Sequence, residues 1–105
     1  MATTAVAMDT KIIEAFCQRW KVREFALFGS VLRSDFNDTS DLDIMVSFQQ
    51  DAGWSLLDHV AMRDELILLF GRNVDLVTRN SITLSRNNLR RREILESAEV
   101  IYAAA

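Results

Sequence analysis

The segment Leu42–Phe48 alternates between two sets of side chains, and this period of two constrains the fold more than any other feature of the sequence. Its large apolar set occupies every second position, at Leu42, Ile44, Val46 and Phe48. Because successive side chains of a strand point to opposite faces, the pattern predicts a strand with one buried face. Asp43 lies on the other face, and Asp41 precedes it in the same phase. The segment therefore predicts a sheet that carries carboxylates on one side.

The rest of the chain supplies further strands and helices. Strands are predicted over residues 22–28, 73–78 and 99–103, the last as a short edge strand. Helices are predicted over residues 10–20, over a central segment after Ser55, and from Ser81 or Ser85 to about Glu96. Strands thus alternate with helices, so the expected class is α/β or α+β: a small mixed β-sheet with helices packed on one face.

The central helix has clear signals at both ends. Ser55 and Asp58 have the spacing of a capping box, and Gly71 is suited to the left-handed residue that ends a helix. Its core-facing stripe is expected at Leu57, Val60, Ala61, Asp64, Ile67 and Leu68.

Length and composition indicate one globular domain. The 105 residues suit a single domain over 1–105, with residues 1–8 expected as a flexible tail. The formal net charge of −3 argues against direct nucleic-acid binding. The single cysteine, Cys17, lies among apolar residues and is expected to be a buried thiol in a reducing compartment.

No targeting or membrane segment is predicted. The N-terminal sequence MATTAVAMDT lacks the basic start and apolar run of a signal peptide. The longest apolar run, Leu66–Phe70, is far shorter than the roughly 20 residues of a membrane span. The expected location is cytoplasmic.

The aspartates are the candidate metal ligands. Residues two apart on one face of a strand have Cα atoms roughly 6.5–7 Å apart, so Asp41 and Asp43 can reach toward each other. Such a pair can hold two divalent ions about 3.5–4 Å apart, and magnesium favours carboxylates combined with substrate phosphates. Asp75, on the polar face of another predicted strand, is a third candidate. The alternative is that all three are ordinary solvent-facing strand residues.

A candidate phosphate site precedes the aspartates. A strand that stops at Gly29 and continues into a Ser30-capped turn presents free backbone N–H groups that can hold a phosphate. Arg33 lies three residues beyond Ser30 and can pair with a phosphate oxygen. A plain turn and a surface arginine are the alternatives.

Together these elements resemble the nucleotidyltransferase superfamily of DNA polymerase β. The shared pattern is Gly29-Ser30, ten intervening residues, Asp41-x-Asp43, and Asp75 on a later strand. The resemblance extends from about Val22 to Tyr102 and is closest to the minimal nucleotidyltransferase (MNT) antitoxins that accompany HEPN ribonuclease toxins. It implies the nucleotidyltransferase fold, ATP as substrate and two Mg²⁺ ions.

The resemblance also implies roles for the site residues. Gly29 and Ser30 would hold the triphosphate, Asp41 and Asp43 would bind magnesium, and Asp75 would activate the attacking hydroxyl. The implied activity is transfer of AMP from MgATP to a hydroxyl, expected to be a tyrosine, of a HEPN-type ribonuclease toxin, which is thereby neutralised. Two alternatives stay open: transfer to a small molecule such as an aminoglycoside, and an antitoxin that acts by binding alone.

Overall fold

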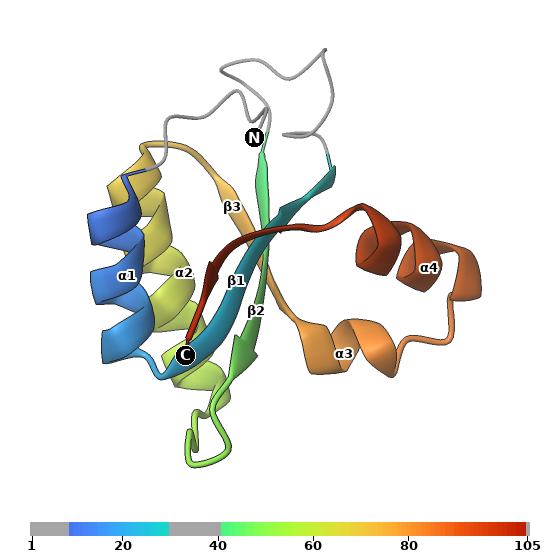
Figure 1. Ribbon diagram of the computed structural model, residues 1–105, viewed down its shortest axis with the longest axis horizontal. Helices are drawn as coiled ribbons and strands as arrows, with labels where there is room; N and C mark the ends of the chain where they lie inside the picture. Colours follow the sequence, from blue (N-terminus) through green and yellow to red (C-terminus); the bar gives the residue numbers. More distant parts are fainter. Residues whose placement is uncertain (1–8, 30–40, 105) are drawn as a thin grey trace.

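The computed structural model describes residues 9–29 and 41–104. Along the chain the elements are α1 (Thr10–Arg19), β1 (Val22–Phe28), β2 (Leu42–Phe48), α2 (Leu56–Phe70), β3 (Val74–Thr78), α3 (Arg79–Thr83), α4 (Asn88–Ser97) and β4 (Glu99–Ala103). Within these residues the strands form a four-stranded sheet in the order β3-β2-β1-β4 (Figure 1). β1 is antiparallel to both of its neighbours, whereas β2 and β3 are parallel. The predicted class, a small mixed sheet with helices, is confirmed.

Helices α1 and α2 lie side by side against one face of the sheet and cover the main core (Figure 1). Phe16 of α1 and Phe25 of β1 meet edge to face, with ring centroids 6.1 Å apart. Cys17 is fully buried in this core, as expected, and burial raises the pKa of its thiol to about 12. The alternation of β2 is confirmed on this face, where Leu42, Ile44 and Val46 are fully buried.

The opposite face of the sheet is covered in part by α3 and α4, so the expectation of helices on one face alone is wrong in this detail. A second apolar cluster joins the strands to these helices through Ala26, Phe28, Met45, Ile82 and Ile94. Met45 belongs to the set of β2 side chains that alternates with the main core, and it is only 4% exposed. Apolar residues of that set must also be shielded from water, and α3 and α4 shield them.

The last predicted helix is divided in two, and neither Ser81 nor Ser85 caps it. The Thr78 hydroxyl accepts a hydrogen bond from the Ser81 backbone N–H (3.1 Å) and begins α3. The Asn87 side chain accepts one from the Arg90 backbone N–H (3.0 Å) and begins α4. Both caps are side chains with strong N-cap preference, so the chain starts a helix twice within this segment.

Helix α2 has the predicted ends but the opposite buried face. The capping box of Ser55 with Asp58 is present, and Gly71 ends the helix in the left-handed region with φ of 67°. The buried residues are Met62 and Leu66, and Ile67 of the expected stripe packs against the core. The other members of that stripe are exposed: Leu57, Val60, Ala61, Asp64 and Leu68. Neither α2 nor any other described helix has the length and apolar character that crossing a membrane requires.

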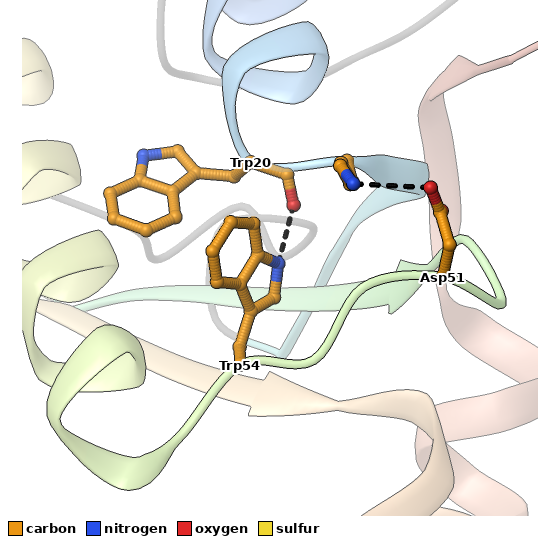
Figure 2. Close-up of polar contacts among 4 residues, drawn as sticks. Trp20, Asp51 and Trp54 are labelled. Atoms are coloured by element: carbon orange, nitrogen blue, oxygen red, sulfur yellow. Dashed lines mark hydrogen bonds and ion pairs between the residues drawn. The ribbon is translucent and has the colours of Figure 1, made fainter.

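The loop before α2 is tied to the corner between α1 and β1, which helps to set the orientation of the helix (Figure 2). The Trp54 indole N–H donates to the Trp20 backbone carbonyl (2.7 Å), and the two rings pack edge to face at 5.1 Å. Lys21 Nζ donates to Asp51 Oδ2 (3.1 Å), a hydrogen bond that lowers the pKa of the Asp51 carboxyl. Trp54 is therefore a packing residue.

Candidate active site

Asp43 and Asp75 are direct neighbours across the parallel pair β2 and β3, where their Cα atoms are partners in register. Adjacent strands lie about 4.8 Å apart, and partners in register point to the same face. The register is fixed by burial, because Ile44 and Leu76, the next pair along, are both in the core. A slip of one residue would turn the carboxylates into that core, so the sheet itself holds the two acids together.

Gly29 lies against the carboxylate of Asp43. It follows Phe28, the partner of Asp43 in the antiparallel pair β1 and β2, and has φ of 73°. A Cβ atom at this position would overlap Asp43 Oδ2 and lie 3.1 Å from Asp43 Cγ. Glycine therefore meets two needs here: a left-handed backbone and close approach to the acid.

Asp41 is exposed and immediately precedes β2. The next residue, Leu42, is anchored by a hydrogen bond from its backbone N–H to the Asn73 carbonyl (2.9 Å), so the start of β2 is fixed beside the start of β3. Ser30 and Arg33 lie outside the described residues. The structure thus brings together Gly29, Asp43 and Asp75, and their roles stay predictions.

The donor chemistry at this end of the sheet suits magnesium. Two carboxylates side by side repel each other, and a cation between them relieves that repulsion. Among residues 9–29 and 41–104, no group of three or more His, Cys, Asp or Glu side chains has the arrangement of a metal site. Magnesium in phosphate chemistry commonly uses only one or two carboxylates together with substrate phosphates and water, so the pair Asp43 and Asp75 fits it.

The same face becomes apolar immediately beyond the two acids. Met45 is the partner of Ala26 on one side and of Val77 on the other, and all three belong to the second apolar cluster. Helices α3 and α4 cover that cluster. The carboxylates are consequently at the polar end of a face whose middle is closed by packing.

A cavity of about 410 Å³ opens at the other ends of β2 and β3 and does not include the acids. Its lining consists of Arg23, Val46, Ser47, Phe48, Thr78, Arg79, Asn80 and Thr83. Ser47 lies four residues after Asp43 on the strand, which corresponds to about 13 Å. Sequence reasoning singled out none of the polar residues of this cavity, because they form no motif and come together only through strand pairing.

Four arginines lie in or just before α4, and most of them are on the surface. Arg86, Arg90 and Arg92 are exposed, while Arg91 is half-buried and donates from Nη1 to the Ser85 carbonyl (3.1 Å). Three of the four arginines are therefore accessible for contact with an acidic group.

His59 is half-buried, and its Nε2 lies 2.9 Å from the Leu76 carbonyl oxygen.

Comparisons of this chain with known proteins point to one family. The family described as "Nucleotidyltransferase domain" matches residues 9–101. The protein adenylyltransferase MntA of Thermococcus cleftensis is 38% identical over 65 residues, which cover 62% of this chain and 64% of that protein. This chain spans just under two thirds of the length of the first curated relatives that it matches.

Solved structures share the fold. One proposed to be a minimal nucleotidyltransferase is 32% identical, with a TM-score of 0.60 over 88% of this chain and 95% of that chain. A toxin-antitoxin crystal structure with AMP-PNP gives a TM-score of 0.70 at 17% identity, over 92% of this chain and 75% of that chain. The MntA-HepT toxin-antitoxin structure gives 0.61 at 16% identity, over 90% and 70%. The match over residues 9–101 shows that this chain belongs to the nucleotidyltransferase domain family.

Proposed function

We propose that this chain is an antitoxin that transfers AMP from MgATP to a hydroxyl group of a HEPN-type ribonuclease toxin. The observation that carries the proposal is the adjacency of Asp43 and Asp75 in register, with Gly29 against Asp43. Membership of the nucleotidyltransferase family, the adenylyltransferase name of the Thermococcus relative and the toxin-antitoxin structures of the same fold support it.

Asp41, Asp43 and Asp75 would hold magnesium, with two ions in the complete site. When bound, magnesium would offset the negative charge of the phosphates. Asp75 would accept the proton of the acceptor hydroxyl, because its carboxylate is exposed next to Asp43. The hydroxyl oxygen forms a bond to the α-phosphorus, the bond from that phosphorus to the bridging oxygen breaks, and pyrophosphate leaves.

The triphosphate would be held at the end of β1. Gly29 lets the backbone approach closely, and Ser30, the next residue in the chain, would add N–H and hydroxyl donors. Arg33 would pair with a phosphate oxygen. These three residues would position the nucleotide so that its α-phosphate lies beside the aspartates.

The acceptor would be a tyrosine of the partner protein. In-line attack requires the hydroxyl to be held opposite the leaving pyrophosphate, and within the described residues the middle of the face is closed by α3 and α4. A docked partner would supply this positioning, with exposed Arg86, Arg90 and Arg92 as part of the contact. The reaction would take place in the cytoplasm, where ATP and magnesium are present.

The test is transfer of radiolabel from ATP labelled at the α-phosphate. The protein is incubated with labelled ATP, magnesium, the product of the adjacent gene and an aminoglycoside in one mixture, and the products are separated. Label on the neighbouring protein is the expected result. Label only on the aminoglycoside, or no label anywhere while the ribonuclease is still inhibited, would contradict the proposal. Asp51→Asn, at an exposed acid of the loop after β2, is the control that keeps full transfer.

A further inference from the structure

The cavity at the end of the sheet away from the aspartates has a basic lining. Its volume is about 410 Å³, and Arg23 of β1 and Arg79 of α3 reach it from two different elements. Ser47 and Asn80 add neutral hydrogen-bonding groups to the same lining. Glu24 offsets the charge of one arginine, because its Oε1 lies 3.5 Å from Arg79 Nη1. The charge of Arg23 remains, so this cavity is basic in a chain whose net charge is −3.

A β-bulge places Arg23 at the cavity. The pairing of β1 with β2 shifts between Val22, the partner of Phe48, and Glu24, the partner of Ser47, so that Arg23 is the inserted residue. Val22 and Phe25 are both fully buried in the main core although they are three positions apart, which a regular strand does not allow. A bulge redirects side chains in this way and is common next to functional sites.

Both guanidinium groups have donors that a ligand can use. Among residues 9–29 and 41–104, the Arg23 side chain forms no ion pair or hydrogen bond. The contact of Arg79 with Glu24 is longer than a good N–H···O hydrogen bond, and the Arg79 side chain is 50% exposed. A guanidinium has five N–H donors, so this contact leaves most of those of Arg79 unused.

The basic cavity adjoins a smaller one that contains aromatic side chains. The second cavity, of about 220 Å³, shares Phe48, Thr78 and Asn80 with the first and is also lined by Trp54. The Trp54 indole N–H is already donated to the Trp20 carbonyl, so the ring offers an apolar surface. A ligand with an anionic group on the arginines can therefore place an apolar ring beside Phe48 and Trp54.

We propose that these joined cavities bind a small molecule in which a phosphate monoester is attached to an aromatic ring. The oxygens of a phosphate point in tetrahedral directions and carry up to two negative charges, so arginines from two elements can bind it together. A planar carboxylate is satisfied by one guanidinium and makes less use of the pair. The larger cavity alone falls within the roughly 300–1,000 Å³ of small-molecule sites.

This site is separate from the candidate active site. Ser47 lies about 13 Å along β2 from Asp43, and Met45 between them is 4% exposed and covered by α3 and α4. The carboxylates of Asp43 and Asp75 repel phosphate unless magnesium is present, whereas the arginines need no metal. Binding without magnesium therefore tests this inference alone, and its failure would leave the proposed transfer of AMP untouched.

The first test is titration of the full chain with phenyl phosphate in EDTA, followed by nuclear magnetic resonance. The expected Kd is about 1 mM or tighter. Arg23→Gln and Arg79→Gln should each weaken binding about tenfold or more, because each removes a charged donor. Arg63→Gln on α2 is the matched control and should bind like the wild type, since Arg63 is 48% exposed and lies 3.6 Å from Asp64. No binding by the wild type, or equal binding by the wild type and Arg23→Gln, would overturn the inference.

The second test locates the ligand and identifies the group that is recognised. In the same titration the backbone amide signals of Ser47 and Asn80 should shift, and that of Gly29 should not. Benzoate, which has the ring but a planar carboxylate, should bind about tenfold more weakly or worse than phenyl phosphate, as should inorganic phosphate, which has no ring. A shift at Gly29 in place of Ser47, or benzoate that binds as tightly as phenyl phosphate, would overturn the proposed site or its phosphate chemistry. Circular dichroism checks that each variant is folded.

Discussion

Asp43 and Asp75 lie 32 positions apart in the sequence, yet their Cα atoms are partners in register across the parallel strands β2 and β3. Buried pairs on either side, Leu42 with Val74 and Ile44 with Leu76, fix this register. The hydrophobic core thereby holds two like charges together, at a cost in stability that a cation can relieve. A magnesium-dependent function would explain why this destabilising pair of carboxylates lies at the candidate site.

Asp43→Asn should abolish magnesium-dependent transfer without unfolding the protein. Loss of a metal ligand removes several kcal/mol of transition-state stabilisation, a fall of at least roughly 100-fold in rate. The free energy of unfolding without metal should stay level or rise by up to about 1 kcal/mol, since the repulsion with Asp75 is removed. Urea denaturation and transfer assays with saturating magnesium measure the two effects. Undiminished transfer would remove Asp43 from the site.

Asp75→Asn should separate binding from chemistry. If Asp75 mainly accepts the proton of the attacking hydroxyl, turnover should fall roughly 10²–10⁴-fold while MgATP affinity changes little. Calorimetric titration with MgATP and single-turnover transfer give the two quantities. A loss of nucleotide binding as large as that of Asp43→Asn would show that Asp75 is chiefly a metal ligand.

Gly29→Ala should lower transfer activity by more than its loss of folding stability accounts for. Gly71→Ala is the matched control. Both glycines have positive φ, 73° and 67°, so each substitution costs about 1–2 kcal/mol of backbone strain. Only at Gly29 would the added Cβ meet another residue, the Asp43 carboxylate, whereas nothing lies within 4 Å at Gly71. Gly29→Ala should therefore lose transfer and Gly71→Ala should keep it. Equal activity of the two variants would contradict the close contact of Gly29 with Asp43.

Cys17 should make stability depend on pH at the alkaline end. Its thiol has a pKa of about 12 in the folded chain against an ordinary value of 9.0, because burial disfavours the thiolate. Because the pKa is raised on folding, the stability that the buried neutral thiol contributes is fully present below pH 9. This stability declines above pH 9, since the thiol of the unfolded chain ionises first. The difference in free energy of unfolding between wild type and Cys17→Ala should shrink by up to about 1.4 kcal/mol per pH unit above 9. Urea denaturation of both proteins from about pH 8 to about pH 10 measures it, and a constant difference would contradict the buried thiol.

The strands were predictable because their residues carry an unambiguous period. Leu42–Phe48 alternates along its whole length, and the structure reproduces its bounds. Helix α2 was harder, since apolar residues occur on both of its faces and periodicity cannot choose between Met62 and Leu68 as the buried residue. The choice depends on packing contacts such as Trp54 against Trp20, which join residues 34 apart in the sequence.

The site was predictable in part for the same reason. The spacing of Asp41 and Asp43 is local and can be read from the sequence, and the approach of Gly29 to Asp43 follows from one strand ending beside the next. The adjacency of Asp75 to Asp43 depends on strand order and register, which no local pattern determines. The cavity at the other end of the sheet arises in the same way and carries no sequence signal.

Covalent modification of the partner is the step on which the proposed function depends, and the intact mass of the partner detects it. The partner is incubated with this protein and MgATP, purified away from it, weighed by mass spectrometry and assayed for ribonuclease activity. We expect a mass increase equal to one or more AMP units and ribonuclease activity that stays low after the two proteins separate. A partner of unchanged mass that regains full activity would contradict covalent transfer and indicate an antitoxin that acts by binding alone.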